Sequence, residues 1–120
     1  MSKIKLSASL KNKNENHIFK GKAIKNGNII TYNDDSVITK IIIDDIITIE
    51  RNKDYQITIN LKEGIKLKGK YITNYGNFKI ETYTKTIIRK EKYIKTIYDL
   101  YINNEYVDTF EYIFEYSIDS

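Results

Sequence analysis

The chain has 120 residues, of which 41% are hydrophobic and 30% charged, and its formal net charge is +4. This is the length of one ordinary domain, and the composition excludes a chain too polar to bury a core. The sequence has no cysteine and one histidine, which excludes disulfide bonds, thiol catalysis and histidine clusters around a metal. We therefore expect a single domain over residues 1–120, with no metal and no cofactor.

The first half of the chain consists of short segments in which apolar and polar residues alternate. These segments cover residues 4–10, 19–23, 29–33, 37–43 and 46–51. Alternation places every second side chain on the same face of a strand, so each segment is predicted to be a half-buried β-strand. Asn26-Gly27 and Asp44-Asp45 lie between such segments, and both pairs are typical of tight hairpins. Strands joined in this way are antiparallel neighbours.

The second half continues the same pattern, over residues 55–61, 65–71, 78–81, 94–102 and 110–118. Asn103-Asn104 is a further hairpin candidate, and no window shows a helical period. About ten strands with short turns form a sheet that tends to close or to fold into two layers, because this removes its exposed edges. The prediction is an all-β, up-and-down antiparallel β-barrel of about ten strands, with a two-sheet β-sandwich as the alternative.

Residues spread over most of the chain from Gly21 onward carry a resemblance to a known family. They are Val37-x-Thr39-x-Ile41, Arg51 at the end of the fifth strand, Tyr71-x-Thr73-x-x-Gly76-x-Phe78-x-Ile80, Thr84 and Tyr98-x-Leu100. In these positions the chain resembles the YwiB-like family of uncharacterised bacterial proteins. Lys53 and Asn74 depart from the pattern, since the family usually has glycine and proline there. The resemblance implies a calycin-type (lipocalin-like) barrel and no established activity.

The candidate binding residues are those predicted to point into the barrel. Arg51 is in phase with Ile47 and Ile49, which places its guanidinium group on the core side of its strand. Five tyrosines are assigned to inward faces as well, and they are Tyr55, Tyr71, Tyr98, Tyr112 and Tyr116. A buried guanidinium and buried hydroxyl groups all need hydrogen-bond partners. An anionic head group held among them would supply such partners.

Two interpretations of the interior remain open. In the leading one, the protein is a non-enzymatic barrel that binds a small apolar or amphipathic ligand through Arg51 and the inward tyrosines. In the other, aromatic rings fill the barrel, Arg51 pairs at the rim with an acid such as Asp108, and the outer surface binds a protein or a nucleic acid. A contiguous cavity that touches Arg51 would favour the first interpretation.

Catalytic chemistry has little support in the sequence. His17 is flanked by polar residues near a loop and is expected to be a solvated surface histidine. The pairs Asp34-Asp35 and Asp44-Asp45 lie at predicted turns, where aspartate is favoured because it bonds to nearby backbone groups. No calcium-loop spacing surrounds them. We expect no catalytic residue.

The charges are unevenly distributed along the chain. Residues 96–120 hold six of the 16 acidic residues and no Lys or Arg, whereas Lys66, Lys68, Lys70 and Lys79 form a basic stripe on neighbouring strands. The stripe is interpreted as a solvent face that discourages edge pairing. We expect nucleic-acid binding to be weak and non-specific, which a salt-controlled mobility-shift assay would check. No segment is apolar enough to span a bilayer, and a cytoplasmic location is expected.

Overall fold

A computed structural model describes residues 1–119, and these form an all-β fold. The strands are β1 (Ser2–Lys11), β2 (Asn16–Asn26), β3 (Ile29–Asp34), β4 (Val37–Ile43), β5 (Ile47–Asn52), β6 (Gln56–Leu61), β7 (Lys66–Lys68), β8 (Lys70–Thr73), β9 (Gly76–Phe78), β10 (Ile80–Lys90), β11 (Tyr93–Ile102) and β12 (Glu105–Ile118). The predicted fold class is thus confirmed. None of the described residues belongs to a helix that could cross a bilayer.

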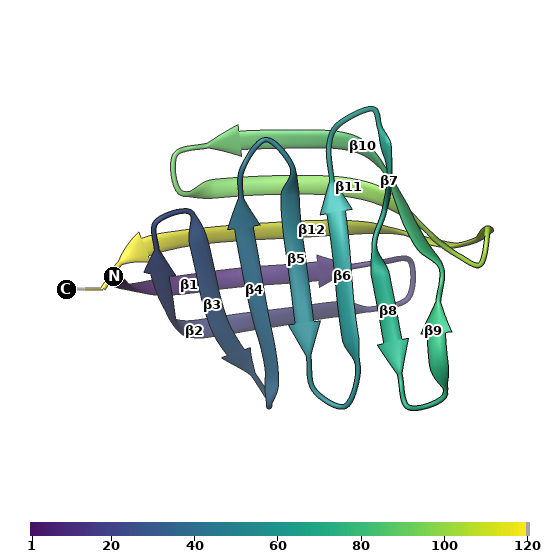
Figure 1. The fold of residues 1–120 in the computed structure, drawn as a ribbon. Helices are drawn as coiled ribbons and strands as arrows, with labels where there is room; N and C mark the ends of the chain where they lie inside the picture. Colours follow the sequence, from purple (N-terminus) through teal and green to yellow (C-terminus); the bar gives the residue numbers. More distant parts are fainter. Residues whose placement is uncertain (120) are drawn as a thin grey trace.

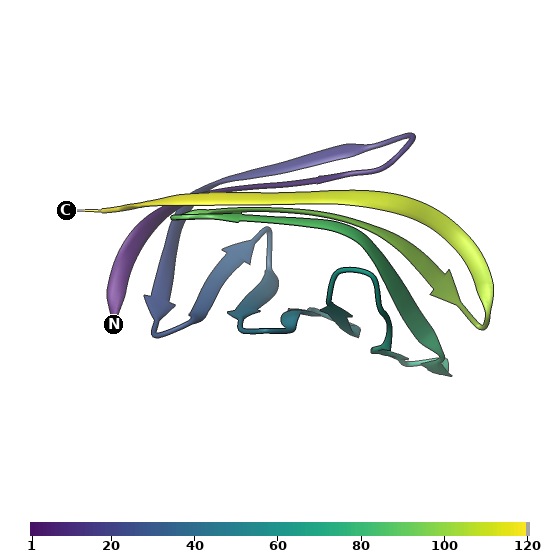
Figure 2. The ribbon, with the colours of Figure 1, turned by 90° about the horizontal axis from the view of Figure 1, so that it is seen from above.

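All twelve strands belong to one antiparallel sheet, in the order β7-β10-β11-β12-β1-β2-β3-β4-β5-β6-β8-β9. The sheet curls into a half-barrel, with the long strands β1, β2, β10, β11 and β12 running crosswise behind the shorter strands β3 to β6 (Figures 1 and 2). Because the ladder is continuous, the alternative of two separate sheets does not apply. The first and last strands are neighbours, so the two ends of the described chain lie close together.

The core lies between the two walls of the curled sheet, and the predicted alternation fills it. On β1, for example, Ile4, Leu6 and Ala8 are buried, and the residues between them face outward. Phe114 of β12 lies opposite Ala8 and is fully buried. Each large apolar side chain buried in this way stabilises the fold by about 1.5–3 kcal/mol.

The strand count differs from the predicted ten because two predicted strands each split in two. The segment 65–71 changes its partner at Gly69, so that β7 pairs with β10 and β8 pairs with β6. The next strand divides in the same way at Lys79, between β9 and β10. Gly69 donates its N–H to the Ile80 carbonyl at 2.9 Å, and a Cβ at this position would lie 2.1 Å from the Thr58 carbonyl oxygen. The partner change therefore needs a residue without a side chain.

Hydrogen bonds outside the regular ladders join the two ends of the sheet where β6 lies beside β7 and β10, a region that we call the seam. Thr82 Oγ1 donates to the Asn60 carbonyl at 2.7 Å, and Asn60 Nδ2 donates to the Lys68 carbonyl at 2.9 Å. The Gly64 N–H donates to the Thr84 carbonyl at 2.8 Å. These bonds hold β6 against β7 and β10, and so they fix the curvature of the half-barrel.

Candidate functional site

A cavity of about 220 Å³ lies inside the half-barrel, between its two walls. Its lining is mostly Ile, Leu, Phe and Tyr side chains, and it also includes His17, Asp34 and Arg51. The volume is many times the roughly 10–15 Å³ that a single water molecule needs. It lies just below the ~300–1,000 Å³ range of ordinary ligand pockets. The aromatic side chains therefore do not completely fill the interior.

The front wall places Arg51 in a row of side chains that crosses five strands. In the ladder Tyr32 of β3 lies opposite Thr39, Thr39 lies opposite Arg51, and Arg51 lies opposite Ile57. Ile57 in turn lies opposite Tyr71 of β8. Residues paired in this way share one face of the sheet, here the inner one. Arg51 thus lines the cavity, on the face that its phase with the preceding isoleucines indicates.

The Arg51 guanidinium is partly buried, and it forms no ion pair or hydrogen bond with any of residues 1–119. Asp108, the acid proposed from the sequence as its partner, instead accepts a hydrogen bond from the N–H of Thr109 at 2.7 Å. A buried cation is normally paired, because removing it from water without a partner costs several kcal/mol. Among residues 1–119, Arg51 is therefore a partly buried cation of the cavity wall without a protein acceptor.

Three buried tyrosines of the cavity wall lie within the electrostatic influence of Arg51. Tyr32 and Tyr112, 80 residues apart in the chain, join their hydroxyl groups at 2.6 Å across the interior. Burial raises the pKa of Tyr112 and of Tyr98 well above the ordinary value, and it raises the pKa of Tyr32, while the positive charge of Arg51 opposes all three shifts. These hydroxyls keep their protons near neutral pH and act as hydrogen-bond donors.

The structure brings together four of the six predicted binding residues. Arg51, Tyr71, Tyr98 and Tyr112 line the cavity, whereas Tyr55 and Tyr116 do not. Tyr55 lies in the turn between β5 and β6, where strand alternation no longer dictates direction. Tyr116 is in phase with Tyr112, but four residues of strand place it roughly 13 Å further along β12. It packs against the core beyond the cavity.

The sequence reasoning missed several residues at the mouth of the cavity. His17 is exposed, as expected, yet its Nε2 lies 2.6 Å from Asp34 Oδ2, and both residues line the cavity. The sequence predicts a turn at Asp34, but this residue is the last one of β3. Its phase with the buried Ile30 and Tyr32 was a usable signal for an inward direction. The ring of Phe19 packs at a tilt against Tyr32 beside this pair, with ring centroids 4.6 Å apart.

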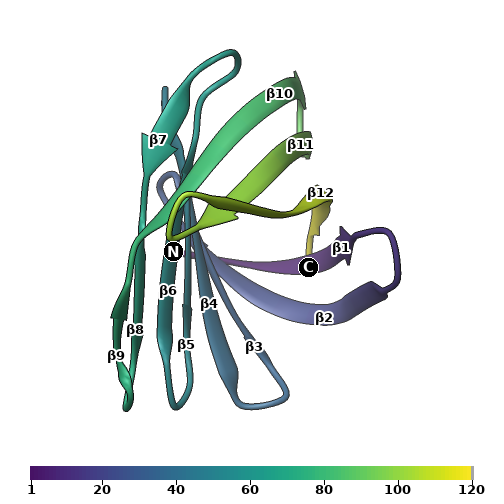
Figure 3. The ribbon, with the colours of Figure 1, turned by 90° about the vertical axis from the view of Figure 1, so that its right-hand side faces the viewer.

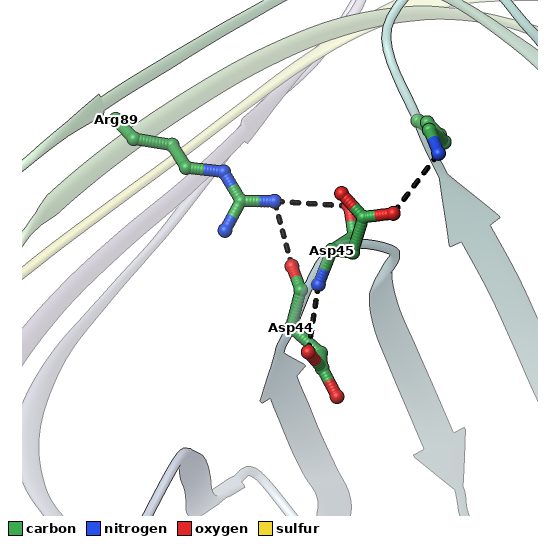
Figure 4. A network of polar contacts seen from close by, with 4 residues as sticks. Asp44, Asp45 and Arg89 are labelled. Atoms are coloured by element: carbon green, nitrogen blue, oxygen red, sulfur yellow. Dashed lines mark hydrogen bonds and ion pairs between the residues drawn. The ribbon is translucent and has the colours of Figure 1, made fainter.

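The second pair of aspartates has a structural role, shown in Figure 4. Asp44 and Asp45 form the predicted hairpin between β4 and β5, and Arg89 of β10 donates to their carbonyl oxygens at 2.7 and 3.1 Å. The Asp45 carboxylate accepts a hydrogen bond from Lys62 Nζ at 2.9 Å, and this bond lowers the pKa of Asp45. These contacts tie the hairpin to the back wall and to the residue that follows β6.

Comparisons with known proteins now place the chain. Residues 3–113 match the model of a family described as Domain of unknown function (DUF1934). The chain belongs to this family. The structure is also similar to the crystal structure of the ywiB protein from Bacillus subtilis, with a TM-score of 0.58 and 14% sequence identity over 97% of this chain and 92% of that one. At this level of sequence identity, the similarity shows that the DUF1934 chain and the ywiB protein share a fold, and it shows nothing more. A comparison with curated proteins gave no match.

The raised tyrosine pKa values predict how the stability of this DUF1934 protein depends on pH. In the folded state Tyr32, Tyr98 and Tyr112 keep their protons at a pH where the unfolded chain, with a pKa of 10.0, loses them. Their contribution to the free energy of unfolding is therefore fully present below about pH 9. Above about pH 10 it falls, by up to roughly 1.4 kcal/mol per pH unit for each tyrosine.

Urea unfolding at a series of alkaline pH values checks this expectation. Tyr98→Phe should make the decline shallower, whereas Tyr75→Phe, at a side chain that is 95% exposed, should leave it unchanged. If the two variants show the same slope as the unmodified protein, burial of these hydroxyls does not control the alkaline stability.

Proposed function

We propose that this protein is a non-enzymatic half-barrel that binds a small amphipathic molecule with an anionic head group. The observation that supports the proposal is Arg51, a cation without a protein partner in the wall of a largely apolar cavity. A carboxylate or phosphate head group would accept the hydrogen bonds that the guanidinium donates, and the apolar lining would accept a short hydrocarbon part.

The neighbouring hydroxyl groups suit the same head group. Tyr98 stays protonated and offers a donor. Of the two hydroxyl protons of Tyr32 and Tyr112, one lies in the bond between them and the other is free for a head group, so this wall offers donors and no general base near neutral pH. A guanidinium beside neutral donors recognises a negative charge and does not accept a proton from a substrate. The wall around Arg51 therefore suits binding of an anion.

The size of the cavity limits the ligand to a small molecule. About 220 Å³ is less than a typical drug-sized pocket offers, so a long acyl chain would extend through the mouth beside His17 and Asp34. A ligand with a short apolar part fits entirely inside. We further propose a cytoplasmic location, since a chain without cysteine suits a reducing compartment.

Isothermal titration with octanoate and with octanol tests the proposal. Both molecules have the same apolar part, and only octanoate carries a charge for Arg51 to bind. We expect octanoate to bind at least about tenfold more tightly, as one charged hydrogen bond of about 1.5–3 kcal/mol predicts. Equal affinities would contradict the role of Arg51, and no binding of either molecule would contradict the proposed function.

A further inference from the structure

The ladder between β2 and β3 is unusually short. Ten residue pairs join β1 to β2, but only three pairs join β2 to β3, and the last of these is Ile24 with Thr31. Beyond that point β2 runs crosswise to β3 and turns away from it (Figures 1 and 3). Residues 16–23 of β2 therefore have a strand partner on one edge only.

This free edge is protected by the charge of its lysines and not by a proline or a bulge. The chain has no proline, and the β1–β2 register runs without a bulge. The free edge of β10 differs, because Glu63 Oε1 accepts a hydrogen bond from the Ile87 N–H there. Side chains of His17 and Phe19 reach Asp34 and Tyr32 on the inner side, but they leave the backbone edge of β2 unpaired. An edge of eight residues with unpaired N–H and carbonyl groups is a template for another strand.

The outer face beside this edge carries lysines that form no ion pair, although Glu91 and Glu115 line the same surface hollow. Lys20 and Lys22 of β2 lie opposite Ser7 and Lys5 of β1, so that Lys5 and Lys22 face each other directly. None of these three lysines forms an ion pair with any of residues 1–119. Like charges directly opposite each other in a sheet are unfavourable, and an acidic neighbour would relieve the repulsion.

The other edge of β1 shows which strand chemistry suits this sheet. There β12 places Glu115 opposite Ser7 and Glu111 opposite Lys11 on the outer face. Its Tyr112 and Phe114, which alternate with these acids, point inward and are buried. The strand that pairs with this edge of β1 thus carries acidic residues on its outer face and apolar residues on its inner face. The unpaired lysines of β2 favour a strand with the same pattern.

We propose that residues 16–23 of β2 bind an extended acidic segment of a partner protein by β-strand addition. Acidic side chains of that segment face Lys20 and Lys22, and its apolar side chains lie toward Phe19 and the mouth of the cavity. A second copy of this chain is disfavoured as the occupant, since two antiparallel β2 edges would bring their lysines together. This interaction does not depend on the ligand proposed for the cavity.

Fluorescence anisotropy with a labelled nine-residue peptide of alternating glutamate and valine tests the proposal. We expect the peptide to bind and its affinity to fall as salt is raised. Two further versions carry N-methyl groups on alternate backbone amides, in one phase or the other. One of the two should lose binding, because its methyl groups point at β2, and the other should retain it. Equal binding of both versions would overturn strand addition.

Charge reversal provides the second arm of the test. The double variant Lys20→Glu, Lys22→Glu should bind the peptide at least tenfold more weakly. The matched variant Lys68→Glu, Lys70→Glu changes two exposed lysines elsewhere and should bind as the unmodified protein does. Equal losses in both variants, tighter binding of a single-stranded oligonucleotide than of the peptide, or a dimer that forms through β2 without peptide would each overturn the proposal.

Discussion

Replacing Gly69 with alanine should lower the free energy of unfolding by about 3 kcal/mol, the upper part of the range for overpacked sites. The added Cβ would lie 2.1 Å from the Thr58 carbonyl oxygen and 3.1 Å from Ile80 Cγ2. The first of these neighbours is backbone, so no rotation of a side chain relieves the clash. The strand has to move away from β6 at the point where the two ends of the sheet meet.

Urea unfolding of the Gly69→Ala variant measures this loss. Lys70→Ala is the control, because it alters the adjacent residue at an exposed side chain and should change stability by no more than about 0.5 kcal/mol. Amide hydrogen exchange should also become faster at the seam, at the Gly64 and Gly69 N–H groups. An alanine variant as stable as the unmodified protein would mean that the seam is not held as closely as described.

Arg51→Met should leave the stability of the empty protein unchanged or slightly raised, while octanoate binding falls by about 10- to 100-fold. The reason is that Arg51 has no partner among residues 1–119, so its removal leaves no buried acid unpaired. A methionine also fills the space with apolar atoms, and replacing a buried charge in this way is often neutral or stabilising. Thermal unfolding and calorimetric titration of the same variant measure the two effects.

The second arginine of the chain is the matched control. Arg89 donates to the carbonyl oxygens of Asp44 and Asp45, so Arg89→Met should lower stability and leave octanoate binding unchanged. Arg51→Lys keeps the charge but loses the planar two-pronged donor, and it should bind octanoate with intermediate affinity. If Arg51→Met instead destabilises the empty protein by several kcal/mol, Arg51 has a structural partner and the head-group role is wrong.

Alternation of apolar and polar residues was sufficient to determine the fold class and the direction of most side chains. It gave the inward face of β1 and the inward direction of Arg51, Tyr98 and Tyr112. The Asn103-Asn104 hairpin also followed from sequence, since both residues have positive φ and asparagine tolerates it. The turn predicted at Asn26-Gly27 is shifted by one residue in the structure, to Gly27 and Asn28. These features depend on neighbours in the chain, which the sequence shows directly.

Only the tertiary structure decided which of these residues meet. The pairing of Tyr32 with Tyr112, the contact of His17 with Asp34 and the exclusion of Tyr116 from the cavity depend on how the sheet curls. So does the partner change at Gly69, because in the sequence this glycine is one more member of an alternating strand. Periodicity fixes the face on which a side chain lies, whereas the curvature and register of distant strands fix what it faces across the interior.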